Sequence, residues 1–284
     1  MRWEDREGSS NIDDRRASSG AKKAGGIGGI LIAAVITYVM SGGDMGAVLN
    51  SVLSNSMSSA TTSSSSHVSQ DEDRNSRFVS VVLKDTEDVW SQLLPKYGVK
   101  YKKPLLVMYR GSTTSGCGGA SSAMGPFYCP VDQKVYLDLS FFDELKQKFR
   151  AKGDFAEAYV IAHEIGHHVQ NLLGILPKVH QKQRTLSKKA ANALSVKTEL
   201  QADCFSGVWA RYDEQLHHVL QRGDIEEALN AAEQIGDDTL QKNAQGYAVP
   251  DSFTHGTSKQ RKEWFYRGFN SGNLNSCNTF KIIQ

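Results

Sequence analysis

The sequence predicts a helix-dominated α+β domain with a small sheet, preceded by one transmembrane helix. Beyond residue 139 the apolar side chains mostly recur at helical spacing. Only residues 104–109 and 135–139 have the composition or alternation of strands. Residues 24–43 contain no charged side chain. Twenty residues rising ~1.5 Å each would span ~30 Å, the thickness of the hydrocarbon core of a bilayer.

The elements follow from the positions of apolar residues and of helix-ending residues. A helix over 78–94 should end before Pro95 or at Gly98. Residues 111–129 are rich in Gly and Ser and predict a loop between the two strands. Asp224 with Glu227 has the spacing of a capping box. The predicted helices beyond the strands cover 143–152, 154–173 (ended by Gly174), about 188–220, a short one from residue 224, and about 258–271.

Composition limits the possible functions. The chain has 284 residues, with 33 Lys and Arg against 31 Asp and Glu, a formal net charge of +2. This near balance excludes a dedicated nucleic-acid binder on bulk charge, so no nucleic-acid partner is expected. The mean hydropathy of −0.42 excludes a polytopic membrane protein but leaves room for one span.

The chain divides into four predicted parts. Residues 1–23 form a polar N-terminal segment, 24–43 an apolar anchor, 44–74 a Ser-rich linker and 75–284 a folded domain. Residues 51–70 contain ten serines, as expected of a tether.

Basic residues orient the predicted span. Four bases crowd its N-terminal flank (Arg15, Arg16, Lys22, Lys23), and none follows it until Arg74. The positive-inside rule then leaves the N-terminus in the cytoplasm and sends the domain across the membrane. The alternatives are a buried soluble helix or a cleaved signal peptide. The 23 polar residues before the apolar run are atypical of a signal peptide.

The most informative motif is H-E-x-x-H at residues 163–167, on a predicted helix. Residues four apart lie on one helical face, so His163 and His167 can each present a nitrogen to one Zn²⁺ ion. Glu164 would lie beside the metal-bound water, where it can act as general base. The alternative is a pair of structural histidines. His168 lies about 100° round the helix from His167 and is predicted to be structural.

A second motif, E-x-x-x-D, begins at Glu199 on the next strong helix. Glu199 can complete a His₂Glu zinc site with a fourth position left for water, the gluzincin arrangement. Asp203, one turn later, can accept the other N–H of a ligating histidine. Paired acids are more often a solvated helix face, but the neighbours here are apolar.

The chain resembles the bacterial family named "putative neutral zinc metallopeptidase", nearly from end to end. This resemblance implies a zincin-like, membrane-anchored metallopeptidase with a Zn²⁺ cofactor. The resemblance supports the zinc site more strongly than it supports any particular substrate. The matching segments are Met1–Trp3, Asn11–Arg16, the apolar anchor, Thr86–Trp90, Cys117-Gly118 to Tyr128–Pro130, His163–Gln170, Glu199–Ala210, His255-Gly256 and Gln260–Phe269.

His255 is a further catalytic candidate. In thermolysin-like gluzincins a downstream histidine stabilises the oxyanion and an upstream acid orients it; Asp251 is positioned in sequence to be that acid. The alternative is a loop histidine that caps the helix opening near Thr257. His217 and His218 lie on a polar helical segment and are predicted to be exposed.

Four cysteines fit a compartment outside the cytoplasmic membrane, where an even count favours disulfides. The favoured pairs are Cys117–Cys129, which would staple the Gly-rich loop, and Cys204–Cys277. Three pairings are possible, and the sequence does not choose among them. A buried free thiol at Cys204 is the alternative.

These features predict a single-pass peptidase of the bacterial inner membrane with a periplasmic catalytic domain, acting on a peptide or protein substrate. The strand 135–139 can bind that substrate by β-addition, although an internal strand is as compatible with its pattern. The alternatives are a non-catalytic envelope zinc protein with a structural or partner-binding role, and a zinc amidase acting on cell-wall peptide. The retained Glu164 favours an enzyme.

Overall fold

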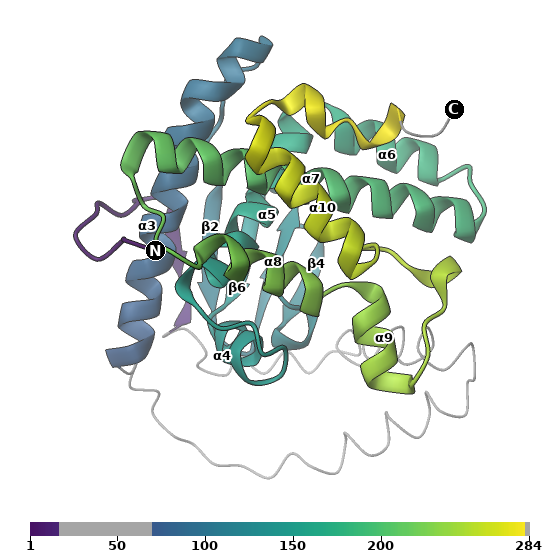
Figure 1. Cartoon of the computed structure of the whole chain (residues 1–284), viewed down its shortest axis with the longest axis horizontal. Coiled ribbons are helices and arrows are strands. Elements are labelled where there is room, and N and C mark those ends of the chain that lie inside the picture. The colour runs from purple at the N-terminus through teal and green to yellow at the C-terminus, as the bar shows by residue number, and fades with distance from the viewer. Residues whose placement is uncertain (17–69, 282–284) are drawn as a thin grey trace.

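The computed structural model describes residues 1–16 and 70–281 and has the predicted class, a helix-dominated α+β fold with a small sheet (Figure 1). The strands are β1 (Ile12–Asp14), β2 (Leu105–Tyr109), β3 (Ser112–Ser115), β4 (Gly118–Ser121), β5 (Phe127–Cys129) and β6 (Lys134–Asp138). The helices are α3 (Gln70–Leu93), α4 (Ser140–Gln147), α5 (Asp154–Leu172), α6 (Ile175–Gln183), α7 (Lys188–His217), α8 (Asp224–Gln234), α9 (Asp237–Gln245) and α10 (Ser258–Ser271).

The main sheet has the order β1-β2-β6-β5. Strands β1, β2 and β6 are parallel, and β5 runs antiparallel to β6 at one edge. Alternate residues of β2 and β6 enter two different cores: Leu106 and Val135 face the helices, whereas Val107 and Tyr136 pack with Ala120 of the β3–β4 hairpin. Both faces are covered, so the inner strands appear in the sequence as nearly continuous apolar runs.

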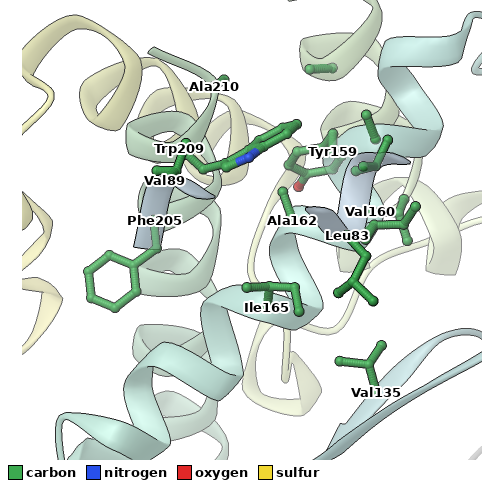
Figure 2. Close-up of a cluster of buried hydrophobic side chains, with 14 of the residues drawn as sticks. Leu83, Val89, Val135, Tyr159, Val160, Ala162, Ile165, Phe205, Trp209 and Ala210 are labelled. Atoms are coloured by element: carbon green, nitrogen blue, oxygen red, sulfur yellow. The ribbon is translucent and has the colours of Figure 1, made fainter. Parts of the chain in front are cut away.

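Helix α5 is the centre of the main core. Figure 2 shows how its side chains meet those of the surrounding elements. The buried side chains labelled there are Leu83 and Val89 from α3, Val135 from β6, Tyr159, Val160, Ala162 and Ile165 from α5, and Phe205, Trp209 and Ala210 from α7. The site motif therefore lies on a helix that is fixed from several sides.

Glycines allow α5, α7 and α10 to approach one another closely. A Cβ at Gly166 of α5 would lie 3.0 Å from the backbone oxygen of Ala202 on α7. A Cβ at Gly268 of α10 would clash with the backbone carbonyl of Cys204, also on α7. These contacts bring the polar residues of the three helices within hydrogen-bonding distance of one another.

Most predicted elements are present, with four differences. The predicted loop 111–129 contains the β3–β4 hairpin and strand β5. Helix α4 ends at Gln147, and the sequence prediction omitted α6 and α9. The predicted capping box at α8 is absent: Gly223 precedes the helix, and Glu227 instead accepts a hydrogen bond from the Phe155 backbone N–H at 3.1 Å.

The N-terminal residues correct the predicted domain boundaries. Residues 1–16 are not a separate segment, because β1 pairs with β2, and Met1 and Trp3 are buried in the main core. The α-amino group of Met1 contacts Asp224 at 3.3 Å, and the Trp3 indole N–H donates to Asp154 at 2.8 Å. The domain therefore includes residues 1–16, and its second part begins with α3 at residue 70 rather than at residue 75.

This packing also bears on membrane topology. The predicted span 24–43 lies outside the described residues, and no helix within residues 1–16 and 70–281 is long and apolar enough to cross a bilayer. The flanks of the stretch 17–69 lie side by side, with Arg16 and Asp73 in ion-pair contact at 3.7 Å. A chain that crossed a membrane once between these flanks could not form the β1–β2 pair. The predicted anchor and localisation themselves stay predictions.

We expect the N-terminal residues to be required for stability. Arg6 contacts the buried Asp85 at 2.7 Å. Burial first, and then the Asp213 carboxylate, raise the pKa of Asp85 to about 9, while Arg6 opposes this shift. Arg6→Met should lower the free energy of unfolding by about 2 kcal/mol, because it removes the charged hydrogen bonds that Arg6 donates to Asp85. The cost is not larger, because Asp85 with its raised pKa is protonated at neutral pH and leaves no unpaired buried charge behind.

Urea unfolding at neutral pH measures this effect. The matched control is Lys84→Met, which removes a more exposed pair with Asp88 and should cost less than about 1 kcal/mol. A chain that starts at residue 75 should fail to unfold cooperatively. Equal losses for the two substitutions, with cooperative unfolding of the shortened chain, would contradict this role of residues 1–16.

His168 predicts a pH dependence of stability. Its side chain is fully buried, with Nε2 hydrogen-bonded to the Lys102 carbonyl at 2.6 Å and Nδ1 to the Tyr128 hydroxyl at 3.1 Å. Burial lowers its pKa from 6.5 to about 4. Above pH 6.5 His168 is neutral in both the folded and the unfolded chain, so it does not make stability depend on pH. As the pH falls from 6.5 towards 4, the unfolded chain binds a proton that the folded chain does not, and stability is lost.

Wild-type protein should therefore lose about 3 kcal/mol more stability between about pH 7 and pH 4 than the His168→Gln variant. The free energies of unfolding are compared with a chelator present, so that metal release does not contribute. Parallel pH profiles for the two proteins would show that His168 is not buried in its neutral form.

Candidate metal centre

The two motifs meet across the contact between α5 and α7. His163 Nε2 lies 3.0 Å from Glu199 Oε2, and His167 Nε2 lies 3.5 Å from Glu199 Oε1. Each of the three side chains offers an atom within 4.8 Å of those of the others. The structure therefore brings together the three predicted ligands, one turn apart on α5 and opposite on α7.

The other ring nitrogens have separate partners. His163 Nδ1 lies 2.9 Å from Asp203 Oδ1, and His167 Nδ1 lies 2.9 Å from Gln170 Oε1. When Nδ1–H donates to an oxygen, Nε2 keeps its lone pair for a metal. Asp203 thus lies where the sequence placed it, and Gln170 is a second partner that the sequence prediction did not identify.

Asp203 is itself held by a buried arginine. Arg261 of α10 donates from Nε to Asp203 Oδ2 and from a terminal nitrogen to Oδ1, both at 2.9 Å. The Tyr159 hydroxyl donates to the same carboxylate at 2.5 Å. Burial raises the pKa of Asp203, but Arg261 and His163 outweigh it and hold that pKa well below its usual range. Asp203 is therefore a fixed carboxylate acceptor for His163.

Glu164 lies beside the three potential ligands His163, His167 and Glu199 and is not itself a member of this set. Its side chain is 8% exposed. Burial raises its pKa, and the nearby His163 and His167 oppose this shift. Glu164, His163, His167 and Glu199 all line a cavity of about 570 Å³. Much of the rest of its wall is apolar, from Met124, Phe127, Phe141, Val160, Leu176 and Val179.

His255 reaches the same cavity, but its predicted partner is wrong. Asp251 is exposed and pairs with Lys189 at 2.9 Å. Asp237, at the start of α9, contacts His255 Nδ1 at 3.2 Å and also accepts a hydrogen bond from the His255 backbone N–H at 2.6 Å. An acid does orient His255, therefore, but it comes from a helix that the sequence prediction omitted.

The favoured cysteine pairs both lie at disulfide distance. Cys117 and Cys129 join the β3–β4 hairpin to β5, with 5.8 Å between their Cα atoms. Cys204 and Cys277 join α7 to the C-terminal tail, with 5.5 Å between their Cα atoms. No cysteine in residues 1–16 and 70–281 is free, so the alternative of a free thiol at Cys204 is wrong.

A second group of potential ligands comprises Asp85, Asp213 and His217. Arg6 lies 2.7 Å from Asp85 and 3.9 Å from Asp213, and His217 Nδ1 contacts Asp213 at 2.7 Å. These contacts form a buried hydrogen-bonded network in which the Arg6 guanidinium already occupies the position of a cation. His217 is consequently partly buried rather than exposed as predicted, whereas His218 is exposed.

The residues around His163 fit a zinc ion. Two imidazole Nε2 atoms and one carboxylate converge, and both histidines are held through Nδ1 by oxygen acceptors. Two histidines and one glutamate form one of the ligand sets that leave a coordination position open at catalytic zinc. A set rich in cysteine would indicate a closed structural site instead, and both cysteine pairs here are at disulfide distance.

Comparisons with known proteins agree with this assignment. The family model described as "Putative neutral zinc metallopeptidase" matches residues 1–280. The chain is 53% identical over 287 aligned residues to "Uncharacterized protein YpfJ" of Escherichia coli K12, covering 99% of each chain. It is 43% identical over 206 residues to "Uncharacterized protein Rv2575" of Mycobacterium tuberculosis, covering 69% of this chain and 67% of the relative. No solved structure matches.

The C-terminal disulfide should affect both stability and metal retention. The disulfide closes a loop whose ends are 73 residues apart in sequence, and it should stabilise the fold by up to ~4 kcal/mol in the chain-entropy model. Cys277→Ser removes this stabilisation and frees the tail from α7. Its melting temperature and its zinc retention should both fall under oxidising conditions. Cys117→Ser, the control, should loosen only the hairpin and leave zinc retention unchanged. Equal zinc loss in the two variants would contradict this assignment.

Proposed function

This chain belongs to the "putative neutral zinc metallopeptidase" family, and we propose that it is a zinc-dependent peptidase with Glu164 as general base. One observation carries this proposal. Glu164 is a buried carboxylate in the cavity, adjacent to three converging ligands and not needed as a fourth. A structural zinc site has no use for a free base in this position.

The chemistry divides between the metal and the chain. Zinc, when bound by His163, His167 and Glu199, supplies an activated water and polarises the scissile carbonyl. Glu164 takes the proton of the attacking water and passes it to the leaving amine. Its raised pKa suits this double task, because the carboxyl must both accept and return a proton near neutral pH. His255, held by Asp237, donates to the oxyanion that develops on the substrate carbonyl.

The substrate is proposed to bind as an extended peptide on β5. The strand predicted for this role, residues 135–139, corresponds to β6, which lies between β2 and β5 and has no free edge. Strand β5 is an edge strand of the sheet, and its residues Phe127 and Tyr128 line the cavity. The backbone of Tyr128 is close enough to the Glu164 carboxylate to lower its pKa. A peptide paired with β5 would therefore lie alongside the general base.

The cavity wall favours an apolar side chain next to the scissile bond. The rings of Phe127, Phe141 and Phe149 line it together with Val160 and Leu176. Apolar substrate area buried against such a surface contributes roughly 25 cal/mol of binding free energy per Å². We propose that peptides with a bulky apolar residue are preferred over peptides with a charged one.

We also propose that the domain works in an oxidising compartment of the bacterial envelope. The support is the two cysteine pairs at disulfide distance, since such bonds persist outside the cytoplasm. Residues 1–16 must then share that compartment with the rest of the fold, because β1 is part of the sheet.

The hydrolase proposal is tested with the purified full chain, loaded with zinc, on a panel of quenched peptides that includes cell-wall peptides. Glu164→Gln should keep zinc and stability but lose activity by about 10²–10⁴-fold, as expected when a general base is removed. The control is Glu263→Gln on the surface of α10, which should retain wild-type activity. Wild-type turnover by Glu164→Gln would refute the mechanism, and zinc binding without turnover of any peptide would favour a non-catalytic zinc protein.

A further inference from the structure

A chain of two buried glutamines leads from His167 to the C-terminal tail. Gln170 lies one turn after His167 on α5, and its Oε1 is 2.9 Å from His167 Nδ1. Gln170 Nε2 donates to Gln201 Oε1 at 3.1 Å, and Gln201 Nε2 donates to the backbone carbonyl of Cys277 at 3.0 Å. Gln170 is fully buried and Gln201 is 5% exposed, so water does not compete for these bonds.

The direction of every bond in this chain is fixed by two backbone carbonyls. A carbonyl oxygen only accepts, so the Cys277 carbonyl requires the NH₂ group of Gln201 to face it. The Gln201 oxygen then faces Gln170, whose NH₂ group also donates to the Thr198 carbonyl at 2.7 Å. Gln170 must therefore present its oxygen to His167. That oxygen accepts, so the ring must donate from Nδ1.

The two histidines thus obtain the same tautomer by different means. His163 donates to a carboxylate, Asp203, whose charge is held by Arg261. His167 donates to a neutral amide whose orientation is set by hydrogen-bond polarity alone. In both rings Nε2 faces the Glu199 carboxylate, so a metal bound by all three side chains would meet the Nε2 atom of each histidine.

The far end of the chain of hydrogen bonds is anchored covalently. Cys277, whose carbonyl orients Gln201, is paired with Cys204 on α7. Further along the tail, Thr279 donates from its hydroxyl to the Lys197 carbonyl on the same helix at 2.7 Å. The disulfide holds the Cys277 carbonyl in place, and the Thr279 bond is a separate attachment of the tail to α7 beyond it.

We propose that Gln170 is a positioning residue for His167, and that Gln201 with the Cys277 carbonyl fixes the direction in which Gln170 acts. This inference rests on the proposed metal centre. It adds that the C-terminal tail contributes to zinc affinity through hydrogen-bond polarity, although its described residues, 272–281, do not line the cavity.

The first experiment measures the zinc affinity of the full chain by competition with a chelator. Gln170→Leu removes the acceptor for His167 and should weaken zinc binding by about 10–100-fold, the usual effect of losing such a partner. Gln170→Glu keeps an acceptor but loses the NH₂ donor, so its zinc affinity should stay close to that of wild type. Both variants should lower the melting temperature, because each leaves a buried carbonyl unpaired.

Zinc affinity and stability therefore separate a positioning role from a structural one. If Gln170→Glu loses as much zinc affinity as Gln170→Leu, Gln170 only stabilises the fold and the proposal is wrong. If the wild-type chain binds no zinc at all, the metal centre itself is refuted.

The second experiment compares two variants that each loosen the tail. Gln201→Leu removes the bond to the Cys277 carbonyl and one of the two bonds that orient Gln170, and should weaken zinc binding severalfold. Thr279→Val, the matched control, removes only the bond to the Lys197 carbonyl and should leave zinc affinity unchanged. Equal zinc affinities for these two variants would overturn the role of Gln201, and this comparison does not depend on whether Gln170→Leu folds.

Discussion

The close contact between α5 and α7 is the constraint on which the rest of the site depends. Gly166 has no side chain, so α5 can approach the backbone of α7 at Ala202. Glu199, less than one turn before Ala202, then reaches both His163 and His167. A larger residue at position 166 would push the helices apart and separate the glutamate from the two imidazoles.

Bringing polar side chains together in a buried interface requires a partner for each of them. Asp203 is paired with Arg261, and His167 with Gln170. The same principle explains the N-terminal residues, where Arg6 meets the buried Asp85 and the Met1 amine meets Asp224. Burying a carboxylate without such a partner would cost stability. Residues 1–16 therefore cannot be separated from the rest of the domain without leaving buried acidic side chains unpaired.

Local patterns in the sequence predicted the part of the site that lies on single helices, whereas non-local pairing was predicted least well. The i, i+4 spacing identified His163 and His167, but Asp237 approaches His255 only because α9 folds back beside it. Strand β1 has three residues and pairs with β2, from a distant part of the sequence, so no local periodicity marks it. The loop prediction for residues 111–129 was wrong for a related reason. Their Gly and Ser content is typical of loops, but their backbone pairs in strands.

The central claim is that two imidazoles and one carboxylate bind zinc with a position left open. X-ray absorption at the zinc edge of the purified full chain tests it most directly. The account predicts a first shell of nitrogen and oxygen at about 2.0–2.2 Å, with two imidazoles and no sulfur. A shell containing sulfur at about 2.3 Å, or four protein ligands with no exchangeable water, would contradict it.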